Sequence, residues 1–456
     1  MGGSAHWKDL SAPVAPLSSH AVLIFLGSLL LLLALARLLG SLAQRVGLPA
    51  IAGELATGVL LGPSLLGHLA PGLSATVLPG PAEQMHLLDA FGQVAVLLLV
   101  GVTGTHLDLR MLRTRARTAV LVSLFGLLIP LGLGVGLGLL LPASMAGPDR
   151  GVFALFLGVA MCVTAIPVIA KTLSDMRLLH RTIGQLTLGA GMIDDAVGWL
   201  LLSVVSAAAT TGITGRGVGL SVALLAGFAL FAATAGRVLV RRVMERAARN
   251  PEPGTAVATA VVLVLAGGTL THLLGMEPVL GAFAVGILIT GAPAAQPKLA
   301  PLRTVVLSVL APLFLATAGL RMDLTALAHP TTALAAFVLL AVAVLGKFAG
   351  AYLGARLSGL SRWEGLALGA GMNSRGVVEV IIAMAGLRLG VLGTAEYTMV
   401  VLVAVFTSLM APPLLRLTMG RVARTEEEHL RLLDHQSWQS ADGADRPAGH
   451  RSGDST

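Results

Sequence analysis

The sequence predicts an all-α polytopic membrane protein with about thirteen transmembrane helices, arranged as inverted repeats with two broken helices that cross. Composition is the first reason, because 55% of the 456 residues are hydrophobic, only 12% are charged, and the mean hydropathy is +0.86. The second is a pair of acids, Asp194 and Asp195, at the centre of an apolar run long enough to span a bilayer. The third is the presence of helix-breaking residues in the middle of two other apolar runs.

Apolar runs separated by Gly, Pro and charged residues predict the individual spans. The expected spans are 20–39, 50–67, 87–106, 117–141, 151–172, 182–209, 218–239, 255–274, 278–292, 303–320, 331–354, 364–387 and 394–416. They place a membrane domain at 20–424, after an N-terminal segment at 1–19. The polar stretch 425–456 is predicted to be a disordered tail, because it has few aliphatic residues.

Lys and Arg are concentrated in alternate loops, which predicts the orientation in the membrane. The loops after the odd-numbered spans and the end of the last span carry most of them: Arg45, Arg110, Arg113, Arg115, Arg117, Lys171, Arg177, Arg181, Arg241, Arg242, Arg246, Arg249, Lys298, Arg303, Arg356, Arg362, Arg416, Arg421 and Arg424. The opposite loops carry only Arg150, Arg216, Arg321 and Arg388. We therefore expect the N-terminus outside and the C-terminus in the cytoplasm of a multi-pass plasma-membrane protein.

The net charge of +8 does not indicate nucleic-acid binding, since the basic residues lie in short loops without accompanying aromatic residues. No metal-ligand spacing, phosphate-binding loop or Ser/His/Asp order stands out, so neither an enzyme nor a bound cofactor is expected. Glu54, His68, His86, His106 and His180 could titrate near neutrality, but residues near span ends are more often interfacial than regulatory.

Two spans contain residues that interrupt a helix. Thr164-Ala165-Ile166-Pro167 lies in the middle of one, where proline removes a backbone donor and clashes with the preceding turn. Asn373-Ser374-Arg375-Gly376 lies at mid-depth in the other. Two interrupted helices in corresponding places of the two halves indicate an inverted-repeat transporter with its site at the midplane. The alternative is a pair of kinks with no site.

An acid pair at mid-membrane is costly, about 2.5 to 3.5 kcal/mol per charge, and usually marks an ion or proton site. Burial disfavours the charged carboxylate, so protons and cations compete for it, and that competition can drive exchange. Adjacent helical residues point about 100° apart. We therefore expect Asp195 to bind the monovalent cation and Asp194 to face a basic partner. The alternative is two structural acids satisfied by neighbouring helices.

Lys347, near the middle of the 331–354 span, is the expected partner of Asp194, because a lysine at that depth must be paired or neutral. The alternative is a lysine that reaches the interface. Arg375 and Glu379 are four residues apart and are expected to pair along one half-helix, in a structural role more than as ion ligands. Neutral oxygens for a cation could come from Thr164, Asn373 and Ser374, whose alternative role is to cap the half-helices.

Four motifs in order resemble the monovalent cation:proton antiporter-2 family over nearly the whole membrane region. They are Gly47–Glu54 with Gly58–Pro63, Thr164–Ala170, Ile193–Trp199 and Met372–Glu379. The broken segments are similar to those of plant cation/proton exchangers and their bacterial relatives. Asp194 departs from the plant pattern, which usually has asparagine there, and is similar to bacterial sodium/proton antiporters with paired aspartates.

The resemblance implies a sodium/proton antiporter-like fold with a core transport part at about 117–209 and 331–416. It implies a dimerisation part at about 20–106 and 255–320, against which the core moves as an elevator in a homodimer. Paired aspartates imply electrogenic transport, with two protons per cation if Lys347 fills the family's lysine position. The short tail argues against the glutathione-gated potassium efflux branch.

The favoured hypothesis is a secondary antiporter in the lipid bilayer that exchanges Na⁺ or K⁺ for H⁺. A pH-gated monovalent cation channel on the same scaffold is the alternative, because the polar cavity lacks an obvious second gate. Export of another solute is a third hypothesis, for which the sequence offers no dedicated pocket.

Overall fold

Every element in the described part of the chain is helical. The computed structural model describes residues 18–72, 82–105, 116–147, 149–211 and 215–425, together with Glu428. The helices are α1 (Ser19–Arg45), α2 (Ala50–Leu61), α3 (Leu66–Leu69), α5 (Ala82–Thr105), α7 (Ala116–Leu140), α8 (Arg150–Cys162), α9 (Ile166–Asp175), α10 (Thr182–Thr211), α11 (Gly215–Phe231), α12 (Arg237–Arg249), α13 (Pro253–Leu273), α14 (Pro278–Ile289), α15 (Ala300–Val305), α16 (Ala311–Gly319), α17 (Pro330–Leu357), α18 (Arg362–Met372), α19 (Val377–Arg388) and α20 (Thr394–Met419). π-Helical turns at Ala232–Gly236 and Val306–Leu310 join α11 to α12 and α15 to α16.

The number of membrane crossings agrees with the expected fold class. Within the described residues, ten helical stretches are long and apolar enough to cross a membrane, and the bent pair α18 and α19 makes eleven. The shorter apolar helices α8 and α14 are two more. The expected number of thirteen crossings is therefore reached only when these two short helices are counted as crossings.

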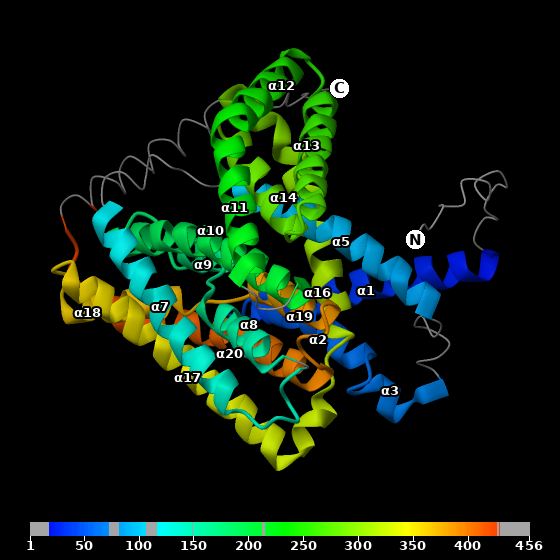
Figure 1. Ribbon diagram of the computed structural model, residues 1–456, viewed down its shortest axis with the longest axis vertical. Helices are drawn as coiled ribbons and strands as arrows, with labels where there is room; N and C mark the ends of the chain where they lie inside the picture. The colour runs from blue at the N-terminus through cyan, green and yellow to red at the C-terminus, as the bar shows by residue number, and fades with distance from the viewer. Residues whose placement is uncertain are drawn as a thin grey trace, which may run out of the picture.

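The helices contact one another in two groups. α7, α8, α10, α17, α18, α19 and α20 form one group, which we call the core group, and α1, α2, α5, α13, α14 and α16 form the other, the scaffold group. In Figure 1 the core group occupies the lower left, while α1, α5 and α14 lie to its right and above. That the scaffold group dimerises and the core group moves stays a prediction.

The contacts repeat when the two halves of the chain are exchanged. α7 packs on α8 as α17 packs on α18, α1 packs on α2 as α13 packs on α14, and α5 packs on α14 as α16 packs on α2. α7 also packs directly against α17. Six spans in each half, joined by the α11–α12 span, would start the second half on the opposite side of the membrane, as inverted repeats require.

One boundary differs clearly from the expectation. The run expected to end at 239 continues through α12 to Arg249, so Arg241, Arg242, Arg246 and Arg249 lie on a helix and not in a loop. Arginine favours the helical conformation, and its long side chain can reach water at the membrane surface. The helix can therefore continue past the apolar run. The N-terminal residues up to 17, the loop with Arg110, Arg113 and Arg115, and residues 429–456 of the tail lie outside the described residues.

The first residues of the tail are folded against α10, although the whole tail was expected to be disordered. The Glu428 carboxylate pairs with Arg181 at 2.8 Å and accepts a hydrogen bond from the Thr182 amide at 2.7 Å. Arg181 also donates to the Val422 and Ala423 carbonyls. A carboxylate at the first amides of a helix is favourable, so this contact stabilises the start of the helix that carries Asp194 and Asp195.

This contact should weaken in acid. Burial alone would raise the pKa of Glu428, but the amides of Thr182 and Thr425 and the Arg181 guanidinium together hold it below its ordinary value. A lowered pKa gives stability that is complete above the unfolded-state value of about 4.5 and is lost as pH falls through the folded-state pKa. Glu428→Gln should lower the melting temperature at pH 7 by about 2 °C. The difference from wild type should shrink below pH 4.5, and a difference that grows there would contradict the assignment.

Candidate functional site

The two interrupted spans meet at their breaks. α8 ends at Cys162 and α9 begins at Ile166, with Val163 extended between them. α18 and α19 are separated by Asn373–Gly376 and bend by 48°. The Ala165 amide donates to the Ser374 carbonyl at 3.2 Å, which joins one break to the other. The expected breaks are therefore both present, and non-helical backbone lies at the crossing, buried inside the protein.

Pro167 is the second residue of α9, so its place explains why the chain restarts a helix there. Proline is favoured in the first helical turn, where its missing amide has no intrahelical partner to lose. The break therefore lies just before the proline and not at it.

Asp194 is completely buried and fully bonded. Its Oδ1 accepts from Ser123 of α7 at 2.5 Å, and its Oδ2 accepts from Thr164 at 2.7 Å. The Lys347 ammonium lies 2.6 Å from the same Oδ2, with both side chains 0% exposed. The expected pair of Asp194 and Lys347 is thus present. Both carboxylate oxygens of Asp194 therefore have partners, and one of the three donors is an ammonium of opposite charge.

Two buried cations also hold the end of α8. Lys347 donates to the Cys162 carbonyl at 2.5 Å and to the Gly126 carbonyl at 3.0 Å. Arg375 donates to the Ala160 carbonyl at 2.9 Å and to the Met161 carbonyl. The last carbonyls of a helix lack intrahelical partners and carry partial negative charge. The two cations therefore compensate the end of α8 inside the membrane.

Arg375 pairs with Glu379 at 3.2 Å, as expected, and both side chains are buried. Ser408 of α20 donates to the Arg375 carbonyl and fixes the break from a third helix. Glu379 lies in the first turn of α19, where a carboxylate favours the helix dipole. The contacts of this pair are structural, because they bind the half-helices to each other.

Asp195 differs from Asp194 in having no hydrogen-bond partner among the described residues, although it is 0% exposed. The backbone amide of Ile166, the first residue of α9, is the hydrogen-bond donor that acts on this carboxylate, outside strict hydrogen-bond geometry. Asn373 and Ser374 are also buried, and their side-chain polar atoms likewise lack partners in the described structure. Buried polar groups normally have partners, so this unpaired set fits a bound cation or proton.

The sequence predicts Thr164 as a possible cation ligand, but in the structure its hydroxyl donates a hydrogen bond to the Asp194 carboxylate. Its oxygen can still accept or coordinate, so this role stays a prediction. Ser123 was missed, because a serine inside an apolar helix usually bonds its own backbone and gives no distinct signal. Its position on α7, one of the two helices that pack across the centre of the core group, became visible only from the fold.

A large cavity of about 930 Å³ lies between the scaffold and core groups. Its wall includes Glu54 and Thr103 from the scaffold group, and Trp199 and Val378 from the core group, with Ile166 of α9. Ile166 and Trp199 flank the part of the crossing where Asp195 lies, since Ile166 acts on that acid and Trp199 follows it by one helical turn. The cavity therefore leads from one membrane face toward the crossing.

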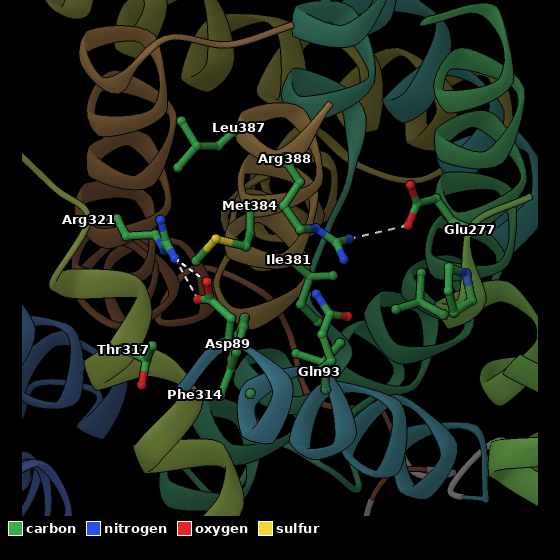
Figure 2. A pocket seen from close by; sticks show the side chains of 14 residues that line it. Asp89, Gln93, Glu277, Phe314, Thr317, Arg321, Ile381, Met384, Leu387 and Arg388 are labelled. Atoms are coloured by element: carbon green, nitrogen blue, oxygen red, sulfur yellow. Dashed lines mark hydrogen bonds and ion pairs between the residues drawn. The ribbon is translucent and has the colours of Figure 1, made fainter. Parts of the chain in front are cut away.

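A smaller cavity of about 180 Å³ lies between the same groups at the opposite ends of the helices. Figure 2 shows two ion pairs on its wall, Asp89 with Arg321 at 2.5 Å and Glu277 with Arg388 at 3.5 Å. The second pair joins the start of α14 in the scaffold group to the end of α19 in the core group. Ile381 lines both cavities. The two cavities therefore lie along the same helix, α19, toward its opposite ends.

Comparison with known proteins gives a consistent result. The family model described as "Sodium/hydrogen exchanger, transmembrane" matches residues 29–419. The Na(+)/H(+) antiporter NhaS4 of Synechocystis sp. is 31% identical over 405 residues, which cover 87% of this chain and 98% of that protein. The Na(+)/H(+)-K(+) antiporter GerN of Bacillus cereus is 28% identical over 398 residues, covering 87% and 96%.

More distant similarities extend to plants and archaea. Cation/H(+) antiporter 15 of Arabidopsis thaliana is 29% identical over 80% of this chain, which spans only 44% of that longer protein. The solved structure of the sodium proton antiporter MjNhaP1 from Methanocaldococcus jannaschii at pH 8 matches with a TM-score of 0.63. That match covers 88% of this chain and 97% of the archaeal one at 16% identity, so it concerns the fold alone.

Proposed function

Because the chain belongs to the sodium/hydrogen exchanger family and is a cation/proton antiporter, we propose that Asp195 is the site shared by the transported cation and the proton. The observation that carries this proposal is the contrast between two adjacent buried acids. Asp194 has three side-chain partners, whereas Asp195 has no side-chain partner among the described residues. An unpaired buried carboxylate gains most from a cation or a proton.

The exchange follows from charge balance at Asp195. The ionised carboxylate binds a monovalent cation, with Asn373 and Ser374 as neutral oxygen donors, and loses it on the other side of the membrane. A proton then neutralises the empty carboxylate, and the uncharged site returns. Asp194 and Lys347 hold the crossing in shape and, if Lys347 also exchanges a proton, make the transport electrogenic. A net charge moved across 100 mV gains about 2.3 kcal/mol.

The proposed movement is an elevator, in which the core group carries the crossing past the scaffold group. Both cavities lie between these groups, on opposite sides of Ile381, as this movement requires. The large cavity is lined by Lys171 and Arg416, which the distribution of basic residues assigns to the cytoplasm. We therefore propose an inward-facing state, an outside N-terminus and a cytoplasmic C-terminus. The family to which the chain belongs supports the further proposal of a homodimer in the plasma membrane.

A transport assay tests the antiporter against the alternatives. Proteoliposomes that contain the purified protein and a pH-sensitive dye should show proton movement on addition of Na⁺, K⁺ or Li⁺, in proportion to cation flux. Coupling that stays fixed over a range of gradients supports the antiporter. Single-channel currents, or cation flux without proton movement, would support the channel instead. The absence of a response to any of the three cations would favour export of another solute.

A further inference from the structure

Glu54 is a buried acid that the mechanism above does not use. It lies on α2 and lines the large cavity, yet its residue is only 9% exposed. No hydrogen bond or close ion pair of Glu54 occurs among the described residues, and Arg37 acts on it only at longer range. Burying a carboxylate costs free energy unless it is paired or binds an ion. A purely structural role therefore does not explain an acid at this position.

The other charged groups on the wall of the large cavity are all basic. They are Arg37 of α1, Lys171 of α9 and Arg416 of α20. A cation that approaches the crossing through this cavity is repelled by these groups. Glu54 is the single acid among the described residues that line the cavity. It therefore provides the favourable charge on the path to Asp195.

The surroundings of Glu54 suit a partly hydrated cation. Gln44, Thr103 and Thr172 line the same cavity and offer neutral oxygens. On the opposite side of Glu54, Gly40 of α1 leaves room for the side chain, since a β-carbon there would lie 3.3 Å from Cγ and 3.5 Å from Oε1 of Glu54. The carboxylate is thus seated against α1 with its remaining surface toward the cavity.

We propose that Glu54 is a staging site that captures the monovalent cation in the large cavity before it reaches Asp195. This rests on the proposed function, since it assigns a step to the same transport path. Glu54 acts by raising the local cation concentration and the rate of capture, as acids in a low-dielectric cleft do. It takes no part in the exchange of cation for proton, which stays at Asp195.

The test uses everted vesicles, in which the face of the large cavity is exposed to added Na⁺, K⁺ or Li⁺. Glu54→Gln should raise the KM for the cation about five- to tenfold, with the maximal rate within about twofold of wild type. Glu54→Asp should restore most of the wild-type KM. Arg37→Gln should lower the KM, because it removes a repulsive charge near Glu54. The matched control is Glu245→Gln, which removes an exposed acid of α12 outside the cavity and should leave the KM unchanged.

Salt dependence gives a second reading. Raising ionic strength with choline chloride should increase the KM of wild type more than that of Glu54→Gln, since screening acts on the charge that the variant lacks. A lower maximal rate with unchanged KM in Glu54→Gln, or a raised KM in Arg37→Gln, would overturn the proposal. If Glu54→Gln does not fold, Glu54→Asp and Arg37→Gln decide, since neither comparison needs that variant. Failure of wild type to move protons would instead contradict the proposed function.

Discussion

Replacing Asp195 by asparagine is expected to abolish cation/proton exchange while the protein stays folded. Asparagine has nearly the same shape but cannot ionise, so it can neither attract the cation nor carry the proton. The attraction between a cation and a carboxylate about 4 Å apart is about 4 kcal/mol at an effective dielectric constant of about 20, so its loss should lower cation-driven proton flux at least about 100-fold. Because Asp195 has no side-chain partner among the described residues, the substitution breaks no side-chain hydrogen bond or ion pair there. Proteoliposome flux and a melting curve measure the two halves of this prediction.

The matched control for Asp195→Asn is Ser206→Ala, which lies about three turns further along the same helix, α10. Ser206 is also buried without a partner in the described structure, so its loss tests whether any polar change in α10 stops transport. It should retain near wild-type flux. Full activity of Asp195→Asn would remove Asp195 from the transport site and leave Asp194 as the candidate.

Replacing Lys347 by methionine is expected to destabilise the protein strongly. The change leaves the Asp194 carboxylate buried without its cation and leaves the Cys162 and Gly126 carbonyls without a donor. Removing one partner of a buried ion pair costs about 3 to 5 kcal/mol in the free energy of unfolding. The melting temperature of the detergent-solubilised protein, followed by tryptophan fluorescence, should fall clearly.

The double variant Lys347→Met with Asp194→Asn separates the ion pair from the other contacts. It should recover much of the lost stability, because the uncompensated charge is gone, but not the two carbonyl bonds that Lys347 makes. Arg356→Met, at the exposed end of the same helix α17, is the control and should change the free energy of unfolding by less than about 0.5 kcal/mol. Equal destabilisation of the single and double variants would show that the pair does not hold the crossing.

The sequence predicts those parts of the site in which a residue is unfavourable for a continuous apolar helix. Pro167 inside an apolar run, and Asn373-Ser374-Arg375-Gly376 inside another, are poor for a continuous helix wherever the rest of the chain lies. Lys347 at mid-depth likewise needs an acid, and the sequence offers the pair Asp194 and Asp195 at the centre of another span. Local rules therefore identified both breaks and the ion pair.

Other features depend on which helices meet, and the sequence alone does not determine that. Ser123 bonds Asp194 only because α7 crosses α10, and Arg375 bonds the end of α8 only because the two breaks touch. Glu428 lies outside every span, yet it binds Arg181 about 250 residues earlier in the chain, at the start of α10. Such contacts are set by packing between distant segments and leave no periodic pattern in the sequence.

The central claim is that one carboxylate binds either the cation or the proton, and proton release on cation binding tests it most directly. Purified protein in a weakly buffered detergent solution is titrated with Na⁺, K⁺ or Li⁺ while a pH electrode or dye follows the solution. Wild type should release protons saturably with the cation that it transports, and Asp195→Asn should release none. Undiminished release from a folded Asp195→Asn protein would contradict the account, because the shared site would then lie elsewhere.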